Sequence, residues 1–278
     1  MIQLDGNMLR QVQMIQLEML VEVDRICQKC GIQYNIIAGT LLGAVRHGGY
    51  IPWDDDADVA LLRPEYEKFR EACKTELDTT RFVFQDYRDT PGYRWGYGKL
   101  RRKDTLFLRE HQEHMPYMQG VFIDIFPLDN VPDNYAMRCV HNFACFCVRK
   151  LLWSEVGKVA HPRPVLRKWY SLLSKVPVSV YFALLRCLEQ MGRHRETRMV
   201  RTLMFPTANR TYGYARSWYS KSIPIEFEGV KLQGPQEYEE YLSFKFGDYM
   251  QLPPVEKRKI HPVTAIELLW QEKQEENA

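Results

Sequence analysis

The sequence of 278 residues lacks the features that would place it in several specialised classes. No stretch reaches the roughly 20 uninterrupted apolar residues that a membrane-spanning helix needs. The first residues, MIQLDGNMLRQVQ, carry an acid early and contain no apolar block like that of a signal peptide. Seven cysteines at irregular spacing indicate reduced thiols in a cytoplasmic protein rather than a disulfide framework. Cys27 and Cys30 have no second pair to complete a zinc site, so we expect them to pack at a helix end.

A 45% hydrophobic and 26% charged composition is that of an ordinary soluble globular protein, but the charge is unevenly distributed. Between Arg138 and Arg201 there are thirteen basic and three acidic residues, a surplus of ten; the rest holds 25 basic and 32 acidic ones. Residues 138–201 also contain many aromatic side chains. They could contact an anionic membrane surface or the acceptor, or form a helical subdomain with a solvated basic face. A nucleic-acid ligand is a third, less favoured reading. Because no nucleic-acid module is recognisable, we expect no such partner.

The most informative stretch is residues 34–63, YNIIAGTLLGAVRHGGYIPWDDDADVALLR. An apolar strand ends at Gly39-Thr40, a short helix and a glycine turn follow, and four aspartates in five positions run into a second strand. In extended chain, Asp56 and Asp58 point to the same side, about 7 Å apart. Two such carboxylates form a natural site for a hard divalent cation such as Mg²⁺.

Two other readings of the acidic run exist. A calcium loop would use Asp54, Asp56, Asp58 and Glu65, but its sixth position needs glycine for a sharp turn and holds Val59. A solvated acidic turn that caps a strand is the second. Both are less favoured than the Asp56/Asp58 site for Mg²⁺, because the glycine-hydroxyl turn, the helix, Pro52-Trp53 and the acidic run into a strand form a specific combination.

A third carboxylate lies in the later apolar run VFIDIF, residues 121–126. An unpaired charge buried there would cost several kcal/mol, so Asp124 needs a partner. A metal shared with Asp56 and Asp58 would provide it, and these three residues are our candidate metal ligands and catalytic residues. Asp129, at the end of the run, is interpreted as structural.

Five further positions are candidates for binding the substrate. Gly39 and Thr40 open a helix whose free N–H groups favour phosphate. Arg46 ends that helix and could add charge or be merely solvated. Lys99 and Arg101 alternate on a strand and could meet a diphosphate, although exposed strand-edge charges are the alternative.

The secondary-structure pattern predicts a mixed α/β protein. We expect helices over residues 5–29, 40–47, 65–73 and 235–246, strands over 34–38, 56–62, 82–85, 95–102, 106–108, 121–126, 225–227 and 230–232, and a helical segment over 133–204.

The string GTLLGAVRHGGYIPWDDDADVALL, with the later segments IDIFPLD and KFGDYMQLPP, closely resembles the LicD family of phosphocholine transferases. These are relatives of fukutin within the polymerase-β-type nucleotidyltransferase superfamily. The resemblance implies a mixed sheet flanked by helices, with 1–132 as catalytic core, 133–205 as a basic helical subdomain and 206–278 completing the catalytic domain. It implies that Gly39 and Thr40 hold nucleotide phosphate and that the aspartate trio binds Mg²⁺, or Mn²⁺ in its place. His261, in the closing motif, would contact the nucleotide or act in catalysis, or else hold a loop.

The same resemblance implies transfer of phosphocholine from CDP-choline to a sugar hydroxyl of a bacterial cell-surface glycan precursor, of teichoic-acid or lipopolysaccharide type, with release of CMP. A lipid-linked acceptor would place the enzyme at the inner face of the cell membrane. A quaternary ammonium group favours aromatic neighbours, and Trp53, Tyr93, Trp95 and Tyr97 are candidates. Other readings remain open: transfer of glycerol or ribitol phosphate from a CDP ester, true nucleotidyl transfer, or a non-catalytic binding protein on the same fold.

Overall fold

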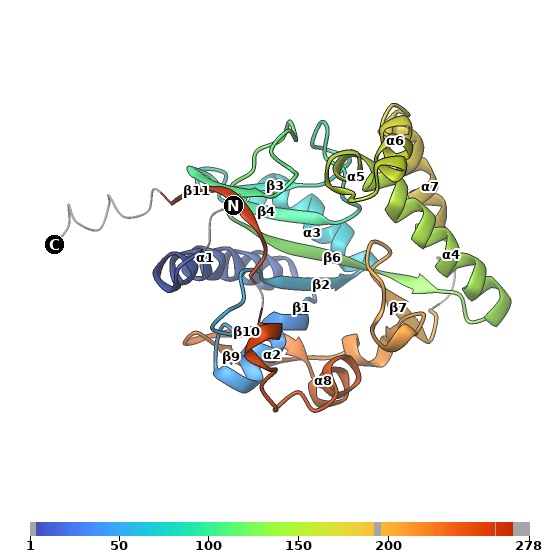
Figure 1. Ribbon diagram of the computed structural model, residues 1–278. Coiled ribbons are helices and arrows are strands. Elements are labelled where there is room, and N and C mark those ends of the chain that lie inside the picture. The colour runs from blue at the N-terminus through green and yellow to red at the C-terminus, as the bar shows by residue number, and fades with distance from the viewer. Residues whose placement is uncertain (1–3, 192–195, 259, 269–278) are drawn as a thin grey trace.

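The computed structural model describes residues 4–191, 196–258 and 260–268. Its centre is a curled mixed sheet whose main path has the order β1-β2-β6-β4-β3, flanked by helices (Figure 1). These strands are β1 (Asn35–Ile36), β2 (Asp58–Leu62), β6 (Phe122–Val131), β4 (Gly98–Arg102) and β3 (Phe82–Gln85). Only β2 and β6 are parallel neighbours along this path; its other pairs are antiparallel. The predicted mixed α/β class is confirmed.

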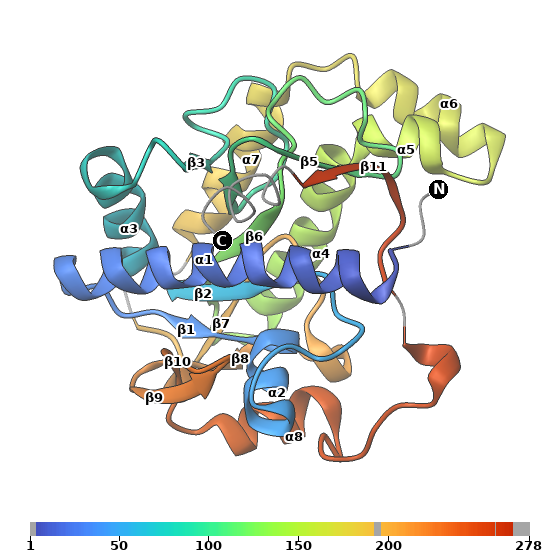
Figure 2. The same cartoon turned by 90° about the vertical axis from the view of Figure 1, so that its left-hand side faces the viewer.

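Helices α1 (Gly6–Cys30) and α3 (Arg63–Glu76) pack against the sheet and against each other (Figure 2). Helix α1 starts where the Asp5 carboxylate accepts from the Met8 amide, and it ends at Gly31, whose φ of 63° suits glycine. Cys27 is buried on this helix and Cys30 is exposed, both as free thiols. At the other edge, the hairpin of β9 (Ser222–Phe227) and β10 (Val230–Pro235) packs against β1, α2 (Ala38–His47) packs against the hairpin, and α8 (Tyr238–Phe246) packs against α2.

Strand β6 is longer than predicted, because it continues through Pro127 to Val131. Proline usually ends a central strand because it has no N–H to donate. Here β4 pairs with β6 only as far as Ile125, and β7 (Met199–Arg201) begins to pair at Asp129. Pro127 therefore lies in the gap between two neighbours, where a donor is not needed on that side.

The segment after β6 contains α4 (Tyr135–Leu152), α5 (Ser154–Ala160), α6 (Pro164–Leu173) and α7 (Val178–Gln190), which project from one end of the sheet (Figure 1). The prediction of helix through residue 204 was wrong at its end, because β7 joins the sheet there and pairs with β6 and β8 (Tyr214–Ala215). Among the described residues, no single helix is long and apolar enough to cross a bilayer, and α6 with α7 meets that test only as a pair bent by 87°. The division at 132/133 and 205/206 remains a prediction.

One strand pair was not predicted in full. Strand β11 (Val263–Leu268) runs antiparallel to β5 (Thr105–Arg109). The pairing brings the C-terminal segment back to the first half of the chain, and it places His261 beside the acidic loop that precedes β2.

Candidate active site

Parallel pairing of β2 with β6 places two of the predicted carboxylates side by side. Asp58 is in register with Asp124, and the Asp124 amide donates to the Ala57 carbonyl at 2.9 Å. Both residues lie near the N-terminal ends of their strands, and neighbouring strands in a sheet are about 4.8 Å apart. The sequence placed them on two separate strands, and the sheet brings them together.

The acidic loop before β2 is held in place by two buried glutamines of α1. Gln13 Nε2 donates to the Asp54 carbonyl and Gln16 Nε2 to the Asp55 carbonyl, each at 2.9 Å. Gly39 packs against the Asp54 side chain so closely that a Cβ at this position would collide with Asp54 Oδ2. These contacts fix four carboxylates in a small volume although they repel one another.

The crowding has a clear electrostatic signature. Burial, followed by the charges of Asp56 and Asp55, raises the pKa of Asp54 to about 8. Burial and the Asp55 charge also raise the pKa of Asp56, and burial with the charges of Asp56 and Asp124 raises that of Asp58 well above its usual value. The protein thus holds more negative charge here than its own cations neutralise, which is the condition that a divalent cation relieves.

Asp55, which sequence reasoning did not single out, behaves in the opposite way. Burial favours its neutral form, but hydrogen bonding to His261 and the charge of Arg109 bring its pKa below the usual value. His261 Nδ1 donates to Asp55 Oδ1 at 2.7 Å, and Arg109 Nη2 lies 3.5 Å from Asp55 Oδ2. Asp55 is therefore an ionised carboxylate that orients both His261 and Arg109.

The donor set fits a hard divalent cation. Asp55, Asp56 and His261 each offer one ligand atom, and these atoms lie within 4.8 Å of one another. Asp55 Oδ2 is buried without a hydrogen-bond partner among the described residues, so it retains a lone pair for a ligand. Carboxylate oxygens suit Mg²⁺ and Mn²⁺, and an imidazole nitrogen favours the transition metal. Asp58 and Asp124 lie outside this triplet, so their predicted role as ligands remains a prediction.

The residues predicted to bind nucleotide phosphate have structural contacts of their own. Thr40 Oγ1 accepts from the Asp58 amide at 2.8 Å, and this bond ties α2 to the start of β2. Helix α2 begins one residue before Gly39, at Ala38, whose φ of 51° is rare for a residue with a side chain. Arg46 Nη1 donates to the Tyr249 carbonyl at 2.8 Å and so anchors the loop after α8. Phosphate binding by Gly39, Thr40 and Arg46 stays a prediction.

Lys99 and Arg101 are both buried, on the same face of β4, but they have different partners. Lys99 forms an ion pair with Asp124, and its ammonium lies 3.4 Å from the centre of the Phe122 ring. Burial lowers the pKa of Lys99 to about 8. Arg101 donates to Gln85 Oε1 at 2.6 Å and to the Gly120 carbonyl at 2.8 Å. The alternative of exposed strand-edge charges is therefore wrong, whereas diphosphate binding remains a prediction.

A cavity of about 200 Å³ connects several of these groups. Its lining joins predicted site residues to aromatic side chains: Asp56, Trp95, Tyr97, Lys99, Arg101, Phe107, Arg109, Gln112, Gln119, Phe122, Asp124, Phe205 and His261. This volume is below that of a typical drug-sized site, so it suits a small phosphorylated head group better than a whole nucleotide.

Six lining residues were not among the candidates from the sequence: Phe107, Arg109, Gln112, Gln119, Phe122 and Phe205. Two of them matter most for binding. Arg109 has a buried Nε without a hydrogen-bond partner among the described residues, so it can still donate to a ligand. The sequence indicates Arg109 only weakly, because a basic residue at the end of the strand TLFLR is an ordinary feature. Phe205 follows β7, and its ring lies 5.5 Å from that of Tyr97.

The four aromatic residues expected near a quaternary ammonium group lie in three different places. Trp95 and Tyr97 line the cavity. Tyr93 is buried in a separate cluster with Met115 and Tyr117, and its hydroxyl donates to the Tyr97 carbonyl. The Arg258 guanidinium lies over the Trp53 ring, 4.4 Å from the ring centre, so a cation already occupies this face of Trp53.

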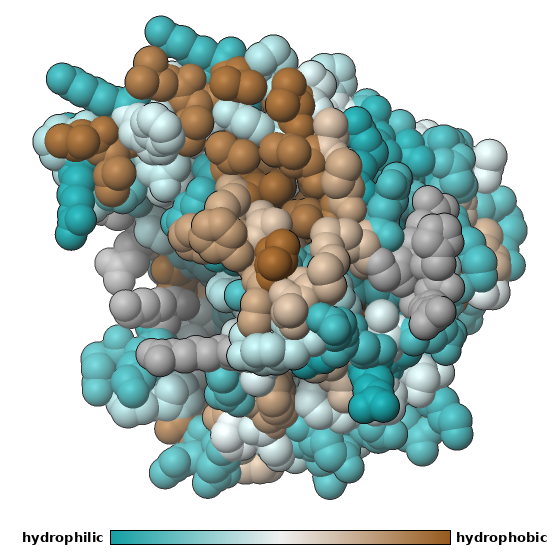
Figure 3. Space-filling model, turned by 90° about the vertical axis from the view of Figure 1, so that its right-hand side faces the viewer, coloured by the Kyte–Doolittle hydropathy of each residue, from teal (hydrophilic) through white to brown (hydrophobic). Residues whose placement is uncertain are grey.

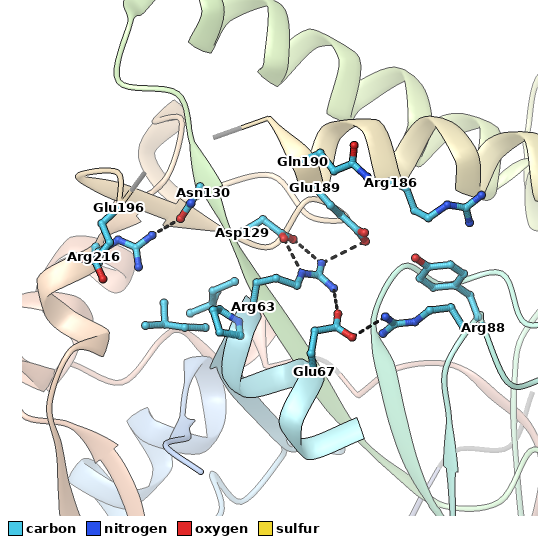
Figure 4. A pocket seen from close by; sticks show the side chains of 14 residues that line it. Arg63, Glu67, Arg88, Asp129, Asn130, Arg186, Glu189, Gln190, Glu196 and Arg216 are labelled. Atoms are coloured by element: carbon cyan, nitrogen blue, oxygen red, sulfur yellow. Dashed lines mark hydrogen bonds and ion pairs between the residues drawn. The ribbon is translucent and has the colours of Figure 1, made fainter. Parts of the chain in front are cut away.

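A larger cavity of about 670 Å³ lies at the opposite ends of β2 and β6 (Figure 4). Its charges are largely matched: Arg63 forms a two-bond pair with Asp129, at 2.6 and 2.7 Å, and also contacts Glu67 and Glu189 at 3.2 Å. Arg88 in turn pairs with Glu67. Because these charges neutralise one another, we place the chemistry at the smaller cavity, where the carboxylates are crowded. The interpretation of Asp129 as structural agrees with this geometry.

Comparison with known proteins finds a family match in the part of the chain that carries the candidate site. Residues 31–138 match the family model described as LicD/FKTN/FKRP, nucleotidyltransferase domain, and this range contains all three predicted carboxylates. Over 279 aligned residues the chain is 26% identical to the lipopolysaccharide cholinephosphotransferase LicD of Haemophilus influenzae, covering 92% of this chain and 96% of that protein. Shorter matches are to uncharacterized proteins of Rickettsia typhi, 39% identical over 54 residues, and Rickettsia prowazekii, 42% over 48. They cover 19% and 17% of this chain, and 18% of each relative. The resemblance drawn from the sequence is confirmed.

Proposed function

We propose that this chain, a LicD-family protein with its LicD/FKTN/FKRP nucleotidyltransferase domain in residues 31–138, is a metal-dependent transferase that moves phosphocholine from CDP-choline to a sugar hydroxyl. The acceptor would be a cell-surface glycan precursor. The observation that carries the proposal is the cluster of Asp54, Asp55, Asp56, Asp58 and Asp124, where burial and crowding together raise the pKa of three members. The name of the Haemophilus influenzae relative, a lipopolysaccharide cholinephosphotransferase, supports phosphocholine as the group transferred.

The reaction is an in-line displacement at phosphorus. The acceptor hydroxyl oxygen forms a bond to the phosphorus that carries choline, the bond from that phosphorus to the CMP oxygen breaks, and the hydroxyl proton passes to a base. A bound Mg²⁺ or Mn²⁺ would neutralise diphosphate charge and lower the pKa of the attacking hydroxyl.

The residues around the cavity have separable tasks in this scheme. Asp56 and Asp58 would hold metal, and Asp124 would hold metal on the acceptor side and help to take the proton. Asp55 would fix His261 and Arg109, and Arg109 would contact donor phosphate through its unused Nε. Trp95, Tyr97 and Phe205 would supply the apolar wall against which a quaternary ammonium packs.

A second candidate is transfer of glycerol or ribitol phosphate from the corresponding CDP ester. Lys99, Arg101 and Arg109 favour it, because three cations at one cavity suit an anionic or polyol group better than a quaternary ammonium. True nucleotidyl transfer from CTP would use the same carboxylates. A non-catalytic protein would be expected to have lost some of them, and here all are present.

The acceptor would be a lipid-linked precursor, and the enzyme would work in the cytoplasm at the inner face of the membrane, through residues 138–201. The basic surplus of this segment supports such contact.

The test measures CMP or pyrophosphate release, and thermal stabilisation, with CDP-choline, CDP-glycerol, CDP-ribitol and CTP in Mg²⁺ or Mn²⁺. Ligands that bind only the native state raise the melting temperature according to their affinity. CMP release from CDP-choline, lost in Asp58→Asn, is the expected result. Preference for another CDP ester would change the substrate and keep the chemistry, pyrophosphate release from CTP would indicate nucleotidyl transfer, and no turnover or stabilisation with any donor would overturn the enzyme proposal.

A further inference from the structure

Helix α6 presents an apolar stripe to solvent. Val165, Trp169 and Leu172 follow one another at i, i+4 and i+7, so they share a face of the helix, and they are 76%, 55% and 58% exposed. The opposite side already packs inward: Tyr170 is buried, and its ring meets that of Trp153 at 5.4 Å. Residues at this spacing normally face a core, so an exposed stripe of this kind requires a partner.

The stripe belongs to a larger apolar face. Exposed apolar side chains also lie on α7 (Val180 and Leu184) and on α4 (Val140, Phe143 and Phe146). Figure 3 looks onto this side of the molecule and shows apolar side chains gathered over its upper and central part, bordered by hydrophilic ones. Single exposed apolar residues are ordinary, but a gathering across three helices marks an interaction surface.

The charges around this face have one sign. The sequence contains no acidic residue between Glu155 and Glu189, whereas Arg163, Arg167, Lys168, Lys175 and Arg186 fall in this interval, and all five are exposed. On α4, Arg149 and Lys150 lie over the Phe146 ring, at 5.5 and 5.8 Å. The surface therefore combines apolar side chains, a tryptophan and a fringe of cations.

We propose that α4, α6 and α7 form a docking surface for an anionic lipid bilayer, with the Val165–Trp169–Leu172 stripe entering the head-group region. Apolar side chains flanked by Lys and Arg are what an interfacial helix requires, and anionic head groups complement the cations. A second copy of the chain complements the face less well, because two such fringes would repel each other.

The docking surface adjoins the active site through α7. Leu184 faces outward, whereas the next residue, Leu185, is buried so close to Gly96 that a Cβ there would collide with it. Gly96 lies between the cavity residues Trp95 and Tyr97. Contact with a bilayer would thus keep the cavity near the surface from which a lipid-linked acceptor is presented. This last consequence rests on the proposed function, whereas lipid binding itself does not.

The experiment is co-sedimentation with two kinds of vesicle, one of phosphatidylcholine alone and one of equimolar phosphatidylcholine and phosphatidylglycerol, at low and high salt. One variant, Trp169→Ser with Leu172→Ser, removes apolar contact, and another, Arg167→Glu with Lys168→Glu, reverses charge. Val21→Ser on α1 and Lys231→Glu on β10 are matched controls, because both residues are exposed on other parts of the molecule.

We expect the wild type to bind the anionic vesicles, with an affinity that falls as salt is added. Each double variant should bind at least about tenfold more weakly, since each basic residue near an anionic surface alone accounts for several-fold. The controls should bind like the wild type, and all variants should release CMP from the soluble donor at the wild-type rate. A failed transferase proposal would leave the vesicle result intact.

Absence of binding to anionic vesicles, or equal binding by the double variants and the wild type, would overturn the proposal. So would a concentration-dependent dimer that Trp169→Ser with Leu172→Ser dissolves, because the face would then be an interface between two copies.

Discussion

Strands β2 and β6 carry charged residues at both of their ends, and the two ends differ in how the charges are balanced. At the N-terminal ends, Asp58 and Asp124 meet the acids of the preceding loop, and burial with mutual repulsion raises the pKa of Asp58. Beyond the C-terminal end of β2, Arg63 takes both oxygens of Asp129, from the far part of β6, in a pair that is mostly buried. The same two strands thus carry one acidic cluster whose charge a cation from outside would balance and one network that supplies its own counter-charges.

Charge balance distinguishes a candidate functional site from a structural network better than cavity size does. The larger cavity lies at the balanced end, where Arg63 is paired with Asp129, Glu67 and Glu189, and removing one partner leaves the other charge in a low dielectric. The smaller cavity lies at the crowded end, where removing one carboxylate relieves repulsion. The two ends should therefore respond in opposite ways to the same chemical change, replacement of aspartate by asparagine.

The largest effect is expected for Asp58→Asn. Loss of this carboxylate should lower the transfer rate about a thousandfold, the scale of other single electrostatic contributors to catalysis. The melting temperature in the absence of metal should stay the same or rise, because a repulsive charge is gone. Steady-state kinetics and thermal melting check both parts, and a large loss of stability would show that Asp58 is not part of a crowded site.

The matched change at the balanced end, Asp129→Asn, should give the reverse. It leaves Arg63 buried without its main counter-charge and should lower the free energy of unfolding by about 3 kcal/mol. The folded fraction should keep most of its transfer rate. Urea unfolding measures the first quantity, and the rate per folded molecule measures the second; normal stability with lost activity would break the comparison.

His141 offers a pH-dependent test near the balanced end. Burial and the charge of Arg201 lower its pKa from 6.5 to about 4, while Asp129 acts weakly in the opposite direction. Between pH 6.5 and about 4, His141 is therefore protonated in the unfolded chain and neutral in the folded chain. The free energy of unfolding thus falls as the pH is lowered from about 6.5 towards 4. The loss should reach about 3 kcal/mol.

The measurement for His141 is the urea midpoint at neutral and mildly acidic pH, for the wild type and His141→Gln. The variant should lose stability less steeply than the wild type as the pH falls. Equal slopes would mean that His141 is not held neutral by its surroundings.

The smallest effect is expected for Phe205→Ala, which removes one aromatic wall of the smaller cavity. The ring is 40% exposed, so the fold should tolerate its loss. If it packs against a quaternary ammonium, KM for CDP-choline should rise several-fold, about the scale of one partly exposed cation–π contact. KM for CDP-glycerol is the internal reference, and an equal rise for both donors would remove choline recognition from this residue.

Much of the candidate site could be predicted from the sequence because its signals are local. An acidic run before an apolar strand, and a lone aspartate within VFIDIF, located Asp56, Asp58 and Asp124. The different role of Asp55 was not accessible, because it depends on His261, which is 206 residues away in the chain. Arg109 reaches the site by the same long-range pairing of β5 with β11.

For the fold too, elements with local sequence signals were predicted, and those that depend on long-range contacts were not. Helix α1 and strand β3 were predicted nearly to the residue, because periodicity and turn signals define them. Strand β7 was taken as helix, since three residues at the edge of a helical segment carry too little pattern, and its pairing with β6 is a tertiary contact. The extension of β6 past Pro127 depends on which neighbour is present at each position, and no local signal encodes that.

The most direct test of the account is calorimetric titration of Mn²⁺ into the wild type, Asp58→Asn and Asp129→Asn at neutral pH. The account predicts saturable binding to the wild type and to folded Asp129→Asn, and binding at least about tenfold weaker in Asp58→Asn, since a ligand charge is lost at one end only. Equal Mn²⁺ affinity in all three proteins, or no binding to the wild type, would contradict the claim that the crowded carboxylates form a metal site.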